Sequence, residues 1–465
     1  MKKVAFHNLG CKVNSYELEF VQQKFTENDF RIVPFDQKAD IYVINTCTVT
    51  NIADRKSRQM LHRAKSLNPD AVVVAMGCYV ETSRNQATED AGIDVLIGNN
   101  EKGNAYEKII EYVSSIEAEK NTDGKADLEP IESVTDYDEF KLSFTTEHTR
   151  VHIKIQDGCN QFCSYCAIPL ARGRVRSRKI EDIVAEVSGL VEKGYKEFVL
   201  TGIHLSSYGM ENYNLEINSQ DSTGEENGAR GFSDFDKNTM LIDAIEAVAN
   251  IDGVKRIRLG SLEPRIITKE FLKRLVVTGK ICPHFHLSLQ SGSNTVLKRM
   301  NRRYTSEEFY EKAMLIREFF EHPAITTDVI AGFPGETEDE FLETKEYMNK
   351  VDFYEAHIFK YSRRKGTVAD KLPGQLTDKE KSARSDVLIN EANVRSRRFR
   401  EYYIGKEVEA LFEESIKIDD EYYMVGHTRE YVKVVLKGLD ESRINTIQVV
   451  KGVKLVGDDI LETVL

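Results

Sequence analysis

Apolar strands and helical segments alternate over the first hundred residues of the chain, and this alternation limits the folds that it can adopt. The segments KVAFHNL, ADIYVINT, AVVVAMG and DVLIGN have the length and composition of strands that are buried on both faces. The stretches between them, such as IADRKSRQMLHRAKSLN, carry helical periodicity. Helices that connect parallel strands cover both faces of the sheet. Residues 1–112 are therefore predicted to form a parallel α/β domain of the Rossmann or flavodoxin-like kind.

A second run of alternating strands and helices begins near residue 150. Six strands, from VHIKIQDG to FYEAHIFKY, predict an incomplete (β/α)6 barrel over residues 149–400, with its active site at the carboxyl ends of the strands. Residues 113–148 are acidic and have no clear period, which favours a linker. Residues 209–238, inside the barrel region, are polar and acidic, and we expect a mobile loop there.

The C-terminal part of the chain has a different pattern. Segments such as EYYMVGHT, YVKVVLKG and INTIQVVKGVKLVGD alternate apolar and polar residues with a period of two. Residues 401–465 are therefore predicted to form a small antiparallel β-barrel. Barrels of this size often bind single-stranded nucleic acid, although a fold alone does not establish a function.

Three cysteines follow the first strand of the predicted (β/α)6 barrel, in the run DGCNQFCSYC. Cys159, Cys163 and Cys166 have the spacing C-x3-C-x2-C. Three thiolates at this spacing can hold three irons of a [4Fe–4S] cluster and leave the fourth iron without a protein ligand. Because an open iron can bind a substrate or a cofactor, the spacing predicts a catalytic cluster. A structural zinc site would need a fourth Cys or His, and His152 and His204 are not at zinc-finger spacing.

Three further cysteines each follow a predicted strand of the first domain: Cys11, Cys47 and Cys78. The carboxyl ends of parallel strands line the crevice where ligands bind, so these thiols are expected to converge and to hold a second metal cluster. A buried structural cysteine after one strand is common, but three in succession favour ligands. The seventh cysteine, Cys282, is expected to be a small buried side chain. Seven cysteines that include two groups of three fit a reducing, cytoplasmic compartment better than a disulfide framework.

The net charge of −12 argues against a protein that coats nucleic acid non-specifically. Positive charge is nevertheless concentrated directly after the cysteine loop, on Arg172, Arg174, Arg176, Arg178 and Lys179. The sequence has no apolar run of about 18 residues, so no transmembrane helix is expected. The N-terminus has no apolar core of the kind found in signal peptides, so no secretion signal is expected either.

Polar residues end several strands of the predicted (β/α)6 barrel and are suited to hold a charged cofactor. They are Thr201 and Gly202 on one strand, Ser261 and Glu263 on the next, Gln290 on a third and Asp328 on a fourth. Glycine at a strand end permits close approach of a ligand to the backbone, and a carboxylate can accept from an ammonium or a hydroxyl. Each residue alone is explained equally well by a turn or a helix cap. Their occurrence at four strand ends of one barrel favours a ligand pocket.

These features together resemble the radical S-adenosylmethionine (SAM) methylthiotransferase family over essentially the whole chain. The matching motifs are LGCKVNSYE, NTCTVT, GCY, DGCNQFCSYC, SSYG, SLEP, LQSGS, GFPGE and YSRRKGT. The resemblance implies an N-terminal domain that carries an auxiliary cluster, a central radical-SAM barrel and a C-terminal TRAM barrel.

The resemblance implies two [4Fe–4S] clusters and SAM as cofactors. The cluster on Cys159, Cys163 and Cys166 would bind SAM, and reduction would cleave SAM to a 5′-deoxyadenosyl radical that takes hydrogen from C2 of an adenine. The auxiliary cluster on the three N-terminal cysteines would hold the sulfur that is methylated by a second SAM and then transferred.

The resemblance also implies partners. The basic run at residues 172–179 and the TRAM barrel would bind tRNA phosphates. An electron donor of the flavodoxin or ferredoxin type and a sulfur source would be needed. No membrane partner is expected, and the protein is expected to be a monomer.

Within the family, the start LGCKVNSYE resembles the branch that acts on N6-threonylcarbamoyladenosine at position 37 of tRNA. The branch that acts on N6-isopentenyladenosine tends to begin GCQMN, and the branch that modifies an aspartate of a ribosomal protein tends to begin GCPKN. Both remain alternatives at this point. A non-catalytic iron–sulfur redox sensor or RNA-binding module is a third, but the four polar strand ends argue against it.

Overall fold

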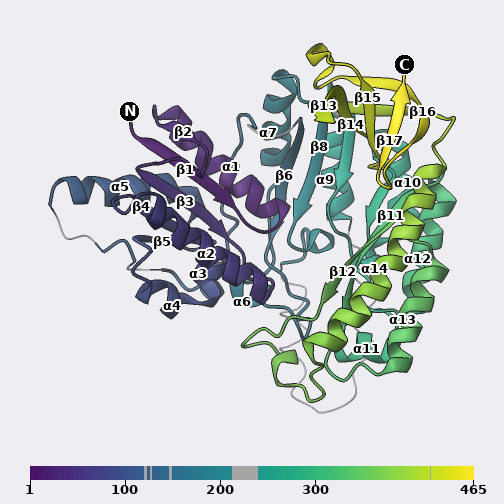
Figure 1. Cartoon of the computed structure of the whole chain (residues 1–465), viewed down its shortest axis with the longest axis horizontal. Helices are drawn as coiled ribbons and strands as arrows, with labels where there is room; N and C mark the ends of the chain where they lie inside the picture. Colours follow the sequence, from purple (N-terminus) through teal and green to yellow (C-terminus); the bar gives the residue numbers. More distant parts are fainter. Residues whose placement is uncertain (120–122, 126–127, 146–148, 212–238, 419) are drawn as a thin grey trace.

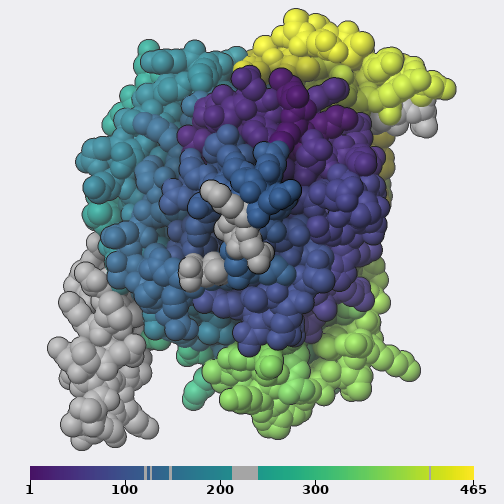
Figure 2. Space-filling view, turned by 90° about the vertical axis from the view of Figure 1, so that its left-hand side faces the viewer, coloured from purple at the N-terminus to yellow at the C-terminus, as the bar shows by residue number. Residues whose placement is uncertain are grey.

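The computed structural model describes the chain except for residues 120–122, 126–127, 146–148, 212–238 and 419. The acidic loop expected at 209–238 therefore lies almost entirely outside the described residues. Figure 1 shows an N-terminal α/β domain beside a central α/β barrel, with a small β-barrel at the C-terminus. Figure 2 shows that the N-terminal domain covers one side of the molecule.

The N-terminal domain has a five-stranded parallel sheet, as the sequence predicts. Its strands are β1 (Lys3–Asn8), β2 (Arg31–Val33), β3 (Ile41–Thr46), β4 (Val72–Gly77) and β5 (Val95–Ile97). Their order, β2-β1-β3-β4-β5, is the flavodoxin-like order, in which the direction of winding changes between β1 and β3. The sequence did not reveal β2, because it has three residues and two of them are exposed.

Helices cover both faces of this sheet because its strands are apolar on both faces. The covering helices are α1 (Lys12–Glu27), α2 (Asn51–Leu67), α3 (Cys78–Thr82), α4 (Arg84–Glu89) and α5 (Ala105–Glu117). Val43 packs in the core shared with α1 and α5, and Tyr42 and Ile44 pack in the core shared with α2. The first of these cores continues into the central barrel, so α1 lies between the sheet and strand β6.

The predicted linker at 113–148 begins too early. Helix α5 continues to Glu117, so residue 113 lies within a helix. Phe140 and Leu142, near the other end of the predicted linker, are buried, and the Phe140 ring stacks on Phe20 of α1 at 5.1 Å. The end of this segment is therefore part of the packed core. The acidic composition of this segment favours a linker, and the two apolar residues are too few to predict packing.

The central domain contains the six parallel strands that the sequence predicts. They are β6 (Arg150–Asp157), β8 (Glu197–Gly202), β9 (Arg256–Leu259), β10 (His284–His286), β11 (Ala324–Ala331) and β12 (Glu355–Lys360). Strands β6, β8 and β9 form one sheet, with the short antiparallel β7 (Arg176–Ser177) at its edge, and β10 to β12 form another. Single bridges, Ile257 to Ile281 and Leu262 to Leu287, join the two sheets into one curved wall.

Helices cover the outer face of this wall. They are α7 (Ile180–Glu192), α9 (Met240–Ala249), α10 (Lys269–Val277), α11 (Asn294–Arg299), α12 (Ser306–Phe319), α13 (Glu338–Val351) and α14 (Asp378–Glu401). The short α6 (Ile168–Arg172) instead contacts α3 of the N-terminal domain. Among the described residues, β12 pairs with β11 alone, so the barrel is incomplete, as predicted. No described helix is long and apolar enough to cross a membrane.

The C-terminal strands close into a five-stranded barrel. They are β13 (Glu407–Ile418), β14 (Glu421–Thr428), β15 (Lys433–Lys437), β16 (Ile447–Val456) and β17 (Ile460–Val464). The prediction of an antiparallel barrel is correct except for one pair, because β15 and β17 run parallel. Parallel pairing of the fifth strand allows the short sheet to close.

Candidate active site

The structure brings the three N-terminal cysteines to one edge of the sheet. Cys11 precedes α1 directly after β1, Cys47 follows β3, and Cys78 begins α3 after β4. These three strands are neighbours, and the edge is the place where the winding of the sheet reverses. A Cβ atom at Gly10 would lie 3.2 Å from Sγ of Cys47, so only a glycine lets the Cys11 loop approach this closely.

The surroundings of these thiols suit a metal cluster. Burial and the charge of Cys78 raise the pKa of Cys47 to about 11, so an isolated thiol there would keep its proton. A bound metal deprotonates a thiol outright, and soft thiolates favour iron–sulfur clusters. The side-chain amide of Asn99 donates to Sγ of Cys78 at 3.5 Å, and the positive charge of Arg172 acts on Cys11. Both interactions favour the thiolate form that a cluster needs.

The second cysteine loop follows β6 and is fixed by contacts with the end of α11. Oγ of Ser164 donates to the carbonyl of Arg299 at 2.8 Å, and the side chain of Asn301 donates to the carbonyl of Phe162 at 2.9 Å. The backbone of Gly158 has φ +70°, and a Cβ atom there would lie 1.7 Å from the carbonyl oxygen of Arg174. The tight turn before Cys159 therefore requires glycine.

Positive charge also lies beside this second group of thiols. The guanidinium of Arg302 donates to Sγ of Cys163 at 3.3 Å. Burial and the neighbouring Cys163 raise the pKa of Cys159 above its usual range and that of Cys166 to about 12. Three soft donors in one loop, with a cation beside them, fit an iron–sulfur cluster that has one open iron.

A cavity of about 450 Å³ lies between the N-terminal domain and the inner face of the central barrel. Four of the residues predicted from strand ends line it: Thr201, Gly202, Ser261 and Asp328. Cys11 and Lys12 reach it from the N-terminal domain, and Tyr431 reaches it from the C-terminal barrel. One hollow therefore connects the auxiliary cysteine site with the carboxyl ends of the barrel strands.

Two of the predicted strand-end residues do not line the cavity. Glu263 is buried and pairs with Arg265, whose guanidinium also contacts Oε1 of Gln161 in the second cysteine loop at 3.3 Å. Gln290 is 8% exposed and has a left-handed backbone, with φ 72°, between strands β10 and β11. Glu263 thus lies on the side of the Cys159 loop, and the backbone of Gln290 is bonded to Asp328 and Ile330 of β11.

The cavity also contains polar residues that the sequence argument missed. These are Lys12, His284, His286, Glu355, His357 and Tyr431. Nε2 of His286 lies 3.2 Å from Oδ2 of Asp328, and its Nδ1 is bonded to Thr326 at 2.9 Å. Ligand atoms of His286, Asp328 and His357 lie within 4.8 Å of one another. The signal was present, because the alternation in HFHLSLQ places His284 and His286 on one face of the strand.

The basic run after the cysteine loop requires a correction. Arg172, Arg176 and Arg178 are at most 3% exposed and cannot reach a phosphate at the surface. Arg172 binds Glu17 of α1 at 2.8 Å and Asp157 of β6 at 3.1 Å, so it joins the N-terminal domain to the barrel. The positions of arginines in a sequence do not reveal whether the fold places a buried carboxylate beside them. The prediction of tRNA contacts is therefore wrong for these three arginines.

Arg174 and Lys179 are the exposed members of the run. The guanidinium of Arg174 lies over the ring of Phe162 in the second cysteine loop, 4.5 Å from the ring centroid. These two cations remain available at the surface.

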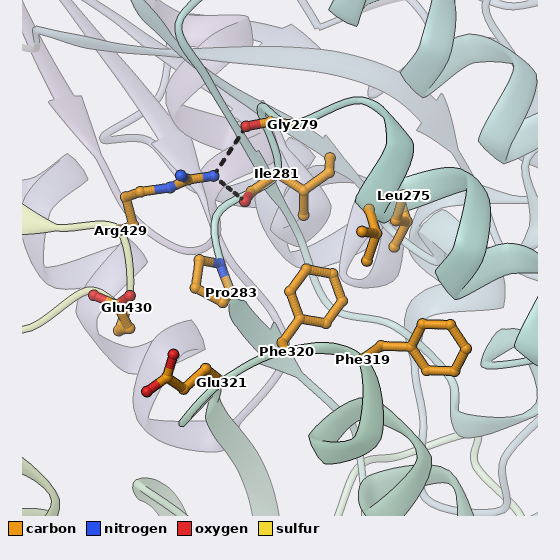
Figure 3. A pocket seen from close by; sticks show the side chains of 10 residues that line it. Leu275, Gly279, Ile281, Pro283, Phe319, Phe320, Glu321, Arg429 and Glu430 are labelled. Carbon is orange, nitrogen blue, oxygen red and sulfur yellow. Dashed lines mark hydrogen bonds between the residues drawn. The ribbon is translucent and has the colours of Figure 1, made fainter.

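A second hollow, of about 260 Å³, lies at the opposite ends of the barrel strands, beside the C-terminal barrel. Figure 3 shows Arg429 bonded to the backbone carbonyls of Gly279 and Ile281 at its rim, with Phe319 and Phe320 nearby. The bond to Ile281 is 2.7 Å long. Arg429 thus attaches the C-terminal barrel to the central one, far along the strands from the cysteine loops.

Comparison with known families supports this division of the chain. Residues 153–348 match the radical SAM superfamily, and residues 3–98 match uncharacterized protein family UPF0004. The threonylcarbamoyladenosine tRNA methylthiotransferase MtaB of Bacillus subtilis is 38% identical over 99% of both chains. The protein of the same name from Aquifex aeolicus is 39% identical over 91% of this chain and 95% of its own.

The chain belongs to the radical SAM methylthiotransferase family. It is a radical SAM enzyme, and this family membership brings SAM and a [4Fe–4S] cluster as cofactors. A tRNA-2-methylthio-N(6)-dimethylallyladenosine synthase of Thermoanaerobacter is a further relative, 32% identical over 97% of this chain and 90% of its own.

Solved structures agree with this fold. The radical SAM methyltransferase TsrM of Kitasatospora setae superimposes with a TM-score of 0.51 at 15% identity, over 78% of this chain and 76% of that chain. At this identity the likeness concerns the fold alone.

Proposed function

We propose that this methylthiotransferase converts N6-threonylcarbamoyladenosine at position 37 of tRNA to its 2-methylthio derivative. The name and near full-length similarity of the relatives from Bacillus subtilis and Aquifex aeolicus support this substrate. The observation that carries the proposal is the cavity that connects Cys11 with the strand ends of the radical SAM barrel. A base held in this cavity would lie beside Cys11 and at the ends of the barrel strands.

Cys159, Cys163 and Cys166 are proposed to hold the cluster that works with SAM, and Cys11, Cys47 and Cys78 are proposed to hold a second [4Fe–4S] cluster. When bound, the two clusters supply an electron for cleavage of SAM and a site for transferable sulfur. The chain's own residues then position the reactants. Thr201, Gly202, Ser261 and Asp328 line the cavity, and Glu263 and Gln290 complete the proposed SAM site from the side of the Cys159 loop.

The protein residues also control charge at the two sites. Arg302 holds negative charge on Cys163, and the bond from Thr326 to His286 fixes the ring beside Asp328. The His286 ring lies beside the Asp328 carboxylate at the wall of the cavity, with 3.2 Å between Nε2 and Oδ2.

For tRNA, the exposed Arg174 and Lys179 and the C-terminal barrel are the proposed contacts, with the barrel acting as a TRAM domain. Phosphate contacts of this kind are expected to weaken as salt is raised. The chemistry also requires a flavodoxin or ferredoxin type of electron donor and a source of sulfur. We place the protein in the cytoplasm, where tRNA and reduced thiols occur together, and expect a monomer.

Cysteine variants of the full-length, anaerobically reconstituted enzyme test this assignment. Cys159→Ala is expected to abolish cleavage of SAM. Cys47→Ala is expected to retain cleavage, measured as 5′-deoxyadenosine, but to form no methylthio product. Cys282→Ala is a matched control, because Cys282 is buried at the start of the β10 region and belongs to neither group. Methylthio product from the Cys47 variant would refute the two-cluster assignment.

The substrate has two alternatives. The relative from Thermoanaerobacter, whose name refers to dimethylallyladenosine, keeps the isopentenyl-type base as a second candidate. An aspartate of a ribosomal protein is the third. Following the methylthio group into tRNA or into protein separates the last candidate from the first two.

A further inference from the structure

Lys12 is a cation at the wall of the cavity. It is the first residue of helix α1 and follows Cys11 directly. Its side chain lines the cavity, and its ammonium forms no hydrogen bond or ion pair with any other residue that the structure describes. Lys12 is exposed and lines the cavity, so its ammonium is accessible to a ligand that enters there. An anionic group of a ligand can therefore pair with this ammonium without displacing any described residue from it.

The carboxylates of the cavity do not serve Lys12, because both have other partners. Asp328 pairs with His286 at 3.2 Å, and Glu355 pairs with Arg400 of α14 at 2.6 Å. An anion for Lys12 must therefore come from outside the described protein.

The neighbouring cations increase the positive potential around Lys12. The guanidinium charges of Arg258 and Arg150 lie close enough to act on the ammonium of Lys12. Each of these arginines has its own carboxylate, Glu197 or Glu413, and each also lies against the ring of Tyr431. Lys12 also lies at the amino end of helix α1, and this end carries a partial positive charge. A negatively charged ligand group is thus favoured at this place.

We propose that Lys12 binds the carboxylate of the threonylcarbamoyl group and thereby selects this substrate over an isopentenyl-modified base. The inference rests on the proposed function. Threonylcarbamoyl is a urea that ends in threonine and carries one carboxylate, whereas isopentenyl is an uncharged hydrocarbon. The urea N–H on the threonine side can donate to N1 of the adenine, which turns the threonine toward the edge that holds C2. Lys12, next to Cys11, lies where that edge would have to face.

Binding to the wild-type protein tests this site first. The full-length reconstituted enzyme is titrated with anticodon stem-loop RNAs that carry threonylcarbamoyladenosine or its neutral, isosteric carboxamide at position 37. A charge-assisted bond to the carboxylate predicts about 10- to 100-fold tighter binding of the acid. Equal dissociation constants for acid and carboxamide would overturn the proposal, and this comparison does not depend on any variant.

Variants then locate the effect. In Lys12→Gln the ratio of the two dissociation constants, carboxamide over acid, is expected to fall to about 1. Lys12→Arg is expected to keep part of the preference for the acid, because arginine carries the same positive charge as lysine. Lys24→Gln, on the same helix but at an exposed position next to Glu27, is the matched control and is expected to keep the full preference. A Lys12→Gln protein that keeps the full preference would contradict the assignment to Lys12.

Binding and transfer measured together distinguish a failure of the proposed reaction from a failure of the Lys12 proposal. If the wild-type enzyme prefers the acid in binding but transfers no methylthio group to it, the carboxylate site is supported and the proposed reaction is wrong. If the wild-type enzyme transfers the group to acid and carboxamide with equal efficiency, the reaction is supported and the role of Lys12 is refuted.

Discussion

Replacement of Glu17 by Gln should weaken the junction between the N-terminal domain and the barrel. Glu17 lies on α1 and is fully buried. It forms ion pairs with Lys102, Lys154 and Arg172. Its Oε1 atom lies 2.8 Å from Nζ of Lys154 and 2.8 Å from Nη1 of Arg172. Glu17→Gln keeps the shape of the side chain, but Asp157 then remains as the carboxylate of Lys154 and Arg172, and Lys102 has no carboxylate partner left among the described residues.

The expected loss follows from this charge count. Removal of one partner from a buried ion network destabilises a protein by about 3–5 kcal/mol, because the remaining charges stay buried without compensation. Glu27→Gln on the same helix is the matched control. Its carboxylate lies 3.9 Å from Lys24 and both side chains are exposed, so a change of at most about 0.5 kcal/mol is expected.

Amide hydrogen exchange measures this loss where it occurs. A protein with three domains does not unfold in one step, so the free energy of local opening of α1 is the appropriate quantity. Protection of the α1 amides should fall by about 3–5 kcal/mol in Glu17→Gln and stay near the wild-type value in Glu27→Gln. Equal protection in the two variants would refute the idea that Glu17 balances this network.

The same network gives a pH dependence with a defined sign. Burial alone would raise the pKa of Glu17, but Arg172, Lys102 and Lys154 outweigh it and hold the pKa well below its usual range. The stabilisation by this carboxylate is therefore present above the unfolded-state pKa of about 4.3 and is lost as the pH falls toward the folded-state pKa. The difference between wild type and Glu17→Gln in the free energy of local opening of α1 should stay constant from about pH 6 to 8. It should become smaller below about pH 4.3.

Four further substitutions have definite expectations. Gly158→Ala places a Cβ atom 1.7 Å from a backbone carbonyl oxygen and should lower the iron bound after reconstitution, whereas Gly194→Ala, with φ +92° and no atom within 4 Å, should cost about 1 kcal/mol and keep its iron. Equal iron contents would contradict this account of the turn. Gly189→Ala, within α7 and with open space around it, should stabilise that helix by about 0.5–1 kcal/mol in the exchange experiment; reduced protection would count against it. Arg302→Met removes the donor to Cys163, 3.3 Å away, and should lower the reduction potential of the cluster in an EPR-monitored titration. An unchanged potential would show that Arg302 does not tune the cluster.

The sequence predicts the fold correctly where the pattern that defines an element lies within a single segment. The apolar runs that became β1, β3 and β4 and the six barrel strands are recognisable because they are continuous and are followed by turns or helices. Convergence of Cys11, Cys47 and Cys78 followed from the rule that carboxyl ends of parallel strands share an edge. Strand β2, by contrast, is held by pairing with β1 and has no apolar pattern of its own.

The site was less accessible from the sequence because it depends on contacts between distant segments. The sequence alone predicts a surface cation at Arg172, because Glu17, which binds it, lies 155 positions away. Lys12 and Tyr431 come from opposite ends of the chain and meet the strand ends only in three dimensions. The period of two that predicts the apolar face of the β10 segment also places the imidazoles of His284 and His286 together on its other face.

The most direct test of the proposed substrate is nucleoside mass spectrometry of bulk tRNA from a strain that lacks the gene for this chain, with and without complementation. Our account predicts that 2-methylthio-N6-threonylcarbamoyladenosine alone disappears and that N6-threonylcarbamoyladenosine accumulates in its place, with recovery when the gene is restored. Unchanged tRNA nucleosides, or loss of a methylthio group from an isopentenyl-type adenosine instead, would contradict it.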